Sequence, residues 1–171
     1  LVKKPQAASL TAGHTMSWRG EKMNLKNYTS SVPIEKTISR IEEVLASAGA
    51  CGISKDYKDS KLMALTFQIA LETKTISIRL PVNIDAVYDL LSKKIKKPRM
   101  GTLNNLRFQA ERTAWKLMQD WVEVQISLIQ MQQVDFIQVF LPYVWDGRQT
   151  FYHALKEKNF LALPADTRGE K

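Results

Sequence analysis

The chain has 171 residues, of which 44% are hydrophobic and 25% charged, and a formal net charge of +8. This is the composition of an ordinary soluble protein, and the length suits one compact domain. The single cysteine excludes an internal disulfide framework and favours a reducing compartment. No apolar run is long enough to span a membrane and no secretory h-region is present, so we expect a cytoplasmic protein.

Residues 1–26 are polar and mildly basic and show no sustained hydrophobic period, so we expect a flexible N-terminal arm. Met16 and Met23 are two potential natural starts, and a start at either would make the residues before it an addition. A single α+β domain is expected over 27–163, with a polar tail over 164–171.

The domain is expected to begin with a helix and a small sheet. Apolar residues recur at helical spacing from Ile34 to Ala48, Pro33 suits a first turn and Gly49 suits the position after the last, which predicts a helix over 33–48. Three extended segments follow. The first starts at Cys51, and the second and third alternate with a period of two. In the second, the predicted apolar face is Met63, Leu65, Phe67, Ile69 and Leu71. The turns between the segments are hairpin-length, so we predict a three-stranded antiparallel meander.

Helices are expected to follow the sheet. Asn83 opens a second helix and Pro98 stops it. A third helix, about 28 residues long, is predicted over 103–131, where the sequence contains no proline or glycine. It carries two apolar stripes, which predict contacts on two sides, one with the sheet and the other with the C-terminal elements or another copy of the chain. A short apolar segment ends at Pro142, and a last helix is expected over 149–158. The fold class is therefore α+β, with helices against one face of the meander.

Four stretches of the chain support a family resemblance. They are Val32-Pro33-Ile34-Glu35-Lys36-Thr37, Leu80-Pro81-Val82-Asn83, Gln109 to Glu123, and Phe140-Leu141-Pro142-Tyr143. Together they resemble a family of small uncharacterised bacterial and phage-associated proteins, over roughly residues 28–163. The resemblance implies a phage or mobile-element setting, and it supplies no catalytic residues.

The most informative feature is a concentration of charge. Residues 93–116 carry a net charge of +7, nearly all of the excess in the chain. Charge concentrated in one place attracts phosphate backbones or acidic partners. The cations are Lys93, Lys94, Lys96, Lys97, Arg99, Arg107, Arg112 and Lys116, and the one acid is Glu111. The alternative is a solvated helix end, since lysines near a helix C-terminus are favoured by its dipole.

Aromatic residues interleave with these cations. Phe108, Trp115 and Trp121 are either core residues or, if exposed beside arginines, a stacking platform for bases. The predicted outer face of the sheet has no aromatic pair, which argues against an RRM-type surface. One cysteine and two histidines exclude zinc recognition modules.

Catalysis has little support in the sequence. His14 and His153 have no partner cysteine nearby, and Cys51 is expected to be an inert, buried thiol. A remote alternative is a metal-dependent nuclease. Helix, three strands and helix is the order of the restriction-type core, and Asp59 with Glu72-Thr73-Lys74 resembles its acidic and Glu-x-Lys elements. The departure is that Glu72 falls at a predicted hairpin tip.

One further acidic pair has two interpretations. Asp120 and Glu123 are three residues apart on the long helix and could share a metal, although a Lys116–Asp120 ion pair at i,i+4 is favoured.

The leading hypothesis is a non-catalytic nucleic-acid-binding accessory protein of phage or mobile-element type, without cofactor or metal. The competing hypothesis is a protein-interaction module, either a homo-oligomer or an inhibitor of a host enzyme.

Overall fold

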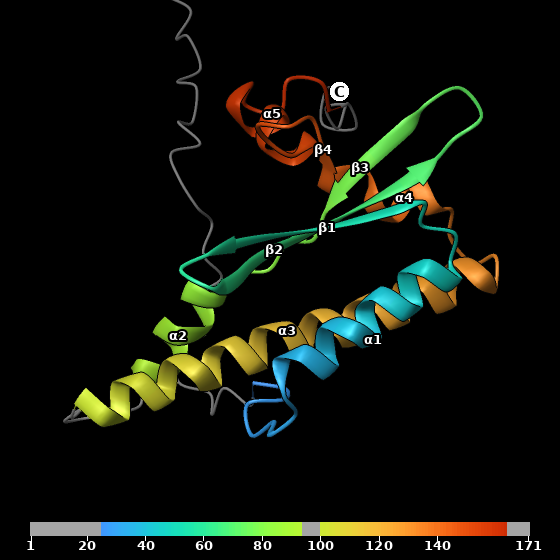
Figure 1. The fold of residues 1–171 in the computed structure, drawn as a ribbon. Coiled ribbons are helices and arrows are strands. Elements are labelled where there is room, and N and C mark those ends of the chain that lie inside the picture. The colour runs from blue at the N-terminus through green and yellow to red at the C-terminus, as the bar shows by residue number, and fades with distance from the viewer. Residues whose placement is uncertain (1–24, 94–99, 164–171) are drawn as a thin grey trace, which may run out of the picture.

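The computed structural model describes residues 25–93 and 100–163, and within them the chain forms an α+β fold (Figure 1). The helices are α1 (Ile34–Ser47), α2 (Ile84–Ser92), α3 (Met100–Gln130), α4 (Phe136–Phe140) and α5 (Phe151–Glu157), with a 3-10 turn η1 at Leu141–Tyr143. The strands are β1 (Gly52–Lys58), β2 (Lys61–Ala70), β3 (Thr75–Arg79) and β4 (Val144–Trp145). They form one antiparallel sheet in the order β1-β2-β3-β4.

Local signals set the end of α1 and the start of α2 as the sequence predicts, whereas α2 ends at Ser92, before the expected stop at Pro98, which lies outside the described residues. At the end of α1, the amide of Ala50 donates to the carbonyl of Leu45 at 3.0 Å. Gly49 has a φ of +95°, which is the left-handed conformation that this helix end requires. At the start of α2, the Asn83 side chain accepts a hydrogen bond from the amide of Ala86 at 2.9 Å.

The sheet differs from the predicted meander in two respects. A fourth strand is present, because Val144 pairs with Ile78 and Trp145 with Ser77. The register of β1 and β2 also shifts between Asp56 and Tyr57, which leaves Met63 as an extra residue in β2. Met63 is therefore exposed, and its predicted place on the apolar face is wrong.

Contacts within one molecule cover most of the two apolar stripes of α3. It has 31 residues, so at 1.5 Å per residue it is about 46 Å long. Figure 1 shows α1 alongside it beneath the sheet, with α2 beside its N-terminal half. Trp115 and Val122 lie in the main core, whereas Ala110 and Ala114 pack in a second cluster with α2. The main core contains Ile38, Ile41, Leu45, Leu65, Phe67, Ile78, Leu80, Trp115, Met118, Val122, Ile126 and Phe140.

Candidate nucleic-acid interface

The basic window begins at the C-terminal end of α2. Lys93 follows the last residue of this helix; its side chain is exposed and makes no ion pair with any residue in 25–93 or 100–163. Lys94, Lys96, Lys97 and Arg99 lie outside the described residues. The sequence places no acid among them, so segment 93–99 carries five positive charges without an internal counter-charge.

The first cation of the window on α3 has acidic partners. The Arg107 guanidinium lies 2.6 Å from a carboxylate oxygen of Asp85 on α2 and 3.8 Å from one of Glu111. It also lies 5.5 Å from the centre of the Tyr88 ring. Glu111 is buried and also accepts a hydrogen bond from Lys61 of β2 at 2.8 Å. Arg107 therefore joins α3 to α2, and much of its charge is compensated.

Lys116 is compensated in the same way. Its amine lies 3.2 Å from Asp120, which confirms the predicted i,i+4 pair. Asp120 also contacts the amine of Lys26 at 2.7 Å and accepts a hydrogen bond from Asn27 at 3.0 Å. Partial burial by itself raises the pKa of Asp120, but the hydrogen bonds from Lys26, Asn27 and Lys116 outweigh it and lower the pKa from 3.8 to about 2.

Arg112 is held by a polar network instead of an ion pair. It donates to the side-chain oxygen of Gln109 at 2.8 Å, and Gln109 donates to the carbonyls of Tyr28 and Ser30. The Nε atom of Arg112 is buried and has no partner in the described residues. These contacts fasten residues 27–30 across α3. The three cations of the window on α3 thus hold neighbouring segments in place: Arg107 and Lys116 pair with carboxylates, and Arg112 bonds to the neutral Gln109. Segment 93–99 has no acid in its own sequence.

The aromatic residues Phe108, Trp115 and Trp121 are not arranged as a platform. Trp115 is only 1% exposed, and Trp121 packs edge-on against Phe140 and Tyr143 with ring centres 5.6 and 5.4 Å apart. Phe108 is 52% exposed, and the amine of Lys61 lies 5.4 Å from its ring centre. Of the three, the two tryptophans pack in or against the core, and Phe108 alone is exposed.

The residues of the nuclease alternative do not come together. Asp59 lies in the β1–β2 turn, whereas Glu72 and Lys74 lie in the turn between β2 and β3. These turns are at opposite ends of a ten-residue strand, which separates them by about 30 Å. The described residues also contain no cluster of His, Cys, Asp and Glu side chains suited to a metal.

Glu123 and Asp120 do not share a site either. Glu123 accepts hydrogen bonds from Arg40 of α1 at 3.0 Å and from Gln119 at 3.1 Å, whereas Asp120 faces Lys26 and Lys116. Burial raises the pKa of Glu123, but the bonds from Gln119 and Arg40 lower it overall.

Cys51 differs from its predicted environment. The residue is exposed, and its Sγ lies 3.4 Å from the carbonyl oxygen of Gln68. The prediction of a buried thiol was wrong because Cys51 precedes β1, an edge strand of the sheet, instead of lying within a covered strand.

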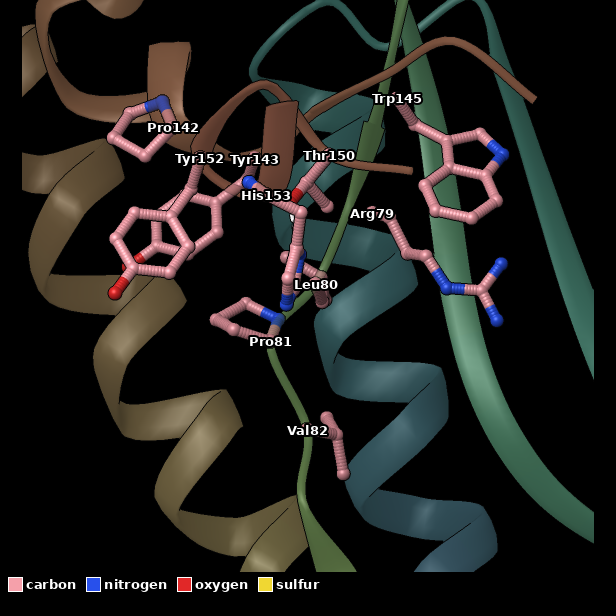
Figure 2. Close-up of a pocket in the computed structure, with 10 residues that line it drawn as sticks. All are labelled: Arg79, Leu80, Pro81, Val82, Pro142, Tyr143, Trp145, Thr150, Tyr152 and His153. Atoms are coloured by element: carbon pink, nitrogen blue, oxygen red, sulfur yellow. Dashed lines mark hydrogen bonds between the residues drawn. The ribbon is translucent and has the colours of Figure 1, made fainter. Parts of the chain in front are cut away.

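A pocket of about 450 Å³ is a feature that no sequence pattern indicated (Figure 2). Its walls come from the connection between β3 and α2, from η1, and from β4 and α5. Tyr143, Tyr152 and His153 supply rings, and Pro81 and Pro142 supply apolar surface. These segments are far apart in the sequence, and the unpredicted pairing of β4 with β3 brings them together.

The His153 ring in this pocket has a defined orientation. Its Nδ1 atom lies 2.7 Å from the hydroxyl of Thr150, which caps α5. The Tyr152 ring meets the His153 ring edge-on, with centres 5.6 Å apart. Among the lining residues Arg79 carries a full charge, and its guanidinium is turned to Asp56 at 2.8 Å and to the Trp145 ring at 4.6 Å. The pocket is thus aromatic and close to neutral.

Within the described ranges, no helix has the length and apolarity to cross a membrane. Comparisons of the chain with protein-family models, with curated proteins and with solved structures found no match.

Proposed function

We propose that the protein binds nucleic acid by contacting phosphates through segment 93–99. The observation that carries this proposal is the contrast in charge compensation. On α3, Arg107 and Lys116 have carboxylate partners within 4 Å and Arg112 is engaged by Gln109. Lys93 has no carboxylate partner among the described residues, and the rest of the segment has no acid in its sequence. Lysine and arginine side chains without nearby acids can neutralise phosphates, and each phosphate that they neutralise releases a condensed counterion from the nucleic acid.

The expected mode of binding is electrostatic and weakly selective for sequence. A basic segment that contacts phosphates fixes position on the strand but reads no base edges. Arg99 adds a planar fork that can grip two phosphate oxygens. The phage or mobile-element setting implied by the resemblance is consistent with such a protein and remains part of the proposal.

A salt-dependent titration tests the proposal. The variant replaces Lys93, Lys94, Lys96 and Lys97 by Gln, and fluorescence anisotropy follows its binding to labelled DNA and RNA, single-stranded and duplex. We expect weaker binding to every form, and a salt slope on duplex DNA that is flatter by about 0.9 for each phosphate that the variant no longer neutralises.

A matched control distinguishes the effect of charge in segment 93–99 from the effect of the overall charge of the protein. Lys36, Lys58, Lys74 and Lys158 are exposed and have no ion pair in the described part of the chain. Replacing these four by Gln removes the same charge and should leave the slope near that of the wild type. The proposal fails if the wild type binds none of the four nucleic-acid forms at low salt, or if both variants lose binding equally.

A second candidate function is a protein-interaction module, and one observation favours it. Val124 and Met131 are 54% and 58% exposed, and with the half-buried Leu128 they form a row at i, i+4 and i+7 along the C-terminal end of α3 and the residue that follows it. An exposed apolar row on a helix is a common contact surface between copies or with a partner. Light scattering tests the first of these, because self-association gives a mass above that of one chain.

A further inference from the structure

We infer that the aromatic pocket beside α5 receives one unpaired base of a single-stranded nucleic acid. The inference deepens the proposed function and rests on it, because segment 93–99 would hold the phosphates of the same strand. The pocket volume, about 450 Å³, falls in the range of small-ligand sites. Four features of the described residues carry the inference: ring surfaces, hydrogen-bonding tips, charge and position.

The ring surfaces suit a planar, uncharged group. Tyr152 is 46% exposed, and its ring and that of Tyr143 both line the pocket (Figure 2). Bases stack on exposed aromatic side chains without regard to sequence, since every base has a π-face. Such stacking is the usual way in which proteins recognise single-stranded loops and ends.

The polar atoms of the pocket suit the edge of a base. Because the Nδ1 atom of His153 contacts Thr150 at 2.7 Å, the Nε2 atom is the ring's remaining polar group, and Figure 2 shows it directed toward Pro81. The hydroxyls of Tyr143 and Tyr152 can both donate and accept hydrogen bonds. These groups match the mixed donors and acceptors along the edges of unpaired bases.

The charge of the pocket fits a base that is joined to phosphates. Of the residues that line it, none is Asp or Glu, so no lining carboxylate repels a phosphate at the mouth. A cationic ligand finds no counter-ion there for the same reason. The charge of Arg79 is already paired with Asp56, so a free small anion would gain little from it.

The position links the pocket to the basic segment. Val82 lines the pocket, and α2 starts two residues later and ends one residue before Lys93. Nine helical residues span about 14 Å, so Lys93 lies a few nucleotides from the pocket along an extended strand. A duplex keeps its bases stacked and paired, so it can use the phosphate contacts but not the pocket.

The experiment compares two tyrosine variants on two ligands. Tyr152→Leu removes a pocket ring, and Tyr57→Leu removes a 60% exposed ring on β1 as the matched control. The ligands are a labelled short oligothymidylate and a labelled DNA duplex of equal length. For Tyr152→Leu we expect roughly tenfold weaker single-strand binding, unchanged duplex binding and an unchanged salt slope, because the substitution removes one stacking ring and leaves every phosphate-binding cation in place.

Additional measurements make each outcome decisive. Tyr152→Phe keeps the ring and loses only the hydroxyl, so it should recover most of the single-strand binding that Tyr152→Leu loses. Circular dichroism and thermal unfolding check that each variant folds. If Tyr152→Leu, folded, binds the oligothymidylate as tightly as Tyr57→Leu does, the base pocket is overturned while phosphate binding by segment 93–99 stands. If the wild type binds neither ligand, the proposed function itself is wrong, and the base pocket that rests on it is wrong too.

Discussion

Asp120 shows how a single residue on α3 decides which charges are compensated. The carboxylate is about four-fifths buried and meets Lys26, Asn27 and Lys116. Burial alone would favour its neutral form, but these partners lower its pKa to about 2. A carboxyl with a lowered pKa in the folded state stabilises the fold at any pH above its unfolded pKa. This contribution disappears as the pH falls through the folded pKa.

Asp120→Asn should therefore lower the free energy of unfolding near neutral pH. The change from 3.8 to about 2 corresponds to about 2 kcal/mol. Urea unfolding of both proteins should show this difference near pH 7, and the difference should shrink between about pH 4 and pH 2. Asp89→Asn, at an exposed position without an ion pair in the described chain, is the control. The role of Asp120 would be contradicted if both variants lost the same free energy of unfolding, or if the loss in Asp120→Asn did not change with pH.

Arg107 gives a prediction that separates structure from binding. Its guanidinium is committed to Asp85, Glu111 and the Tyr88 ring. Arg107→Ala should lower the free energy of unfolding by less than about 1 kcal/mol, since Asp85 is largely exposed. Duplex affinity should change by less than about twofold, without the slope change expected on removing a cation that neutralises a phosphate. A flatter salt slope for Arg107→Ala would instead extend the phosphate site along α3.

At the scale of elements, the β1–β2 turn offers a clear test of backbone strain. Asp59 and Ser60 have φ angles of 51° and 61°, so both occupy the left-handed region that a two-residue hairpin turn requires. Asn-Gly is the preferred sequence for such a turn. Replacing Asp59 and Ser60 by Asn and Gly should raise the free energy of unfolding by about 0.5–1 kcal/mol, measured by thermal or urea unfolding. A fall in stability would show that the Asp59 or Ser60 side chain matters more than the backbone.

The elements with strong local signals could be predicted from the sequence. Gly49, Asn83 and the alternation in β2 depend on residues within one turn or one strand, and all of them mark real boundaries or faces. The extra residue at Met63 could not be predicted, because a bulge is defined by the partner strand. The two-residue β4 is too short to show a period.

The candidate site was harder to predict, for a related physical reason. The sequence shows the concentration of charge in the basic window, but not which of the cations on α3 are paired with acids. Arg107 and Asp85 are 22 positions apart, and Lys61 and Glu111 are 50 apart, so these contacts depend on the packing of α2, α3 and the sheet. The lining of the pocket, from Arg79 to His153, likewise joins segments that only the folded sheet brings together.

In the molecule as a whole, one apolar surface of α3 is not covered by any other element of the described fold. The two apolar stripes predicted a second covering, and α1 and α2 supply it for most of the helix. The row of Val124, Leu128 and Met131 remains outside these contacts and lines a shallow hollow beside Lys26 and Asp120. Association of two copies along this row would remove apolar area from water on both.

We therefore predict that the protein self-associates through the C-terminal half of α3. Light scattering coupled to size exclusion should give a mass above that of one chain at micromolar concentration. Val124→Lys or Met131→Lys should reduce it to the monomer, because a charge at a buried contact costs several kcal/mol unless it is paired. The control is Tyr57→Lys, which alters an exposed side chain on β1 and should not change the mass. A wild-type protein that remains a strict monomer would contradict the prediction, and the exposed row would then be open to a different partner.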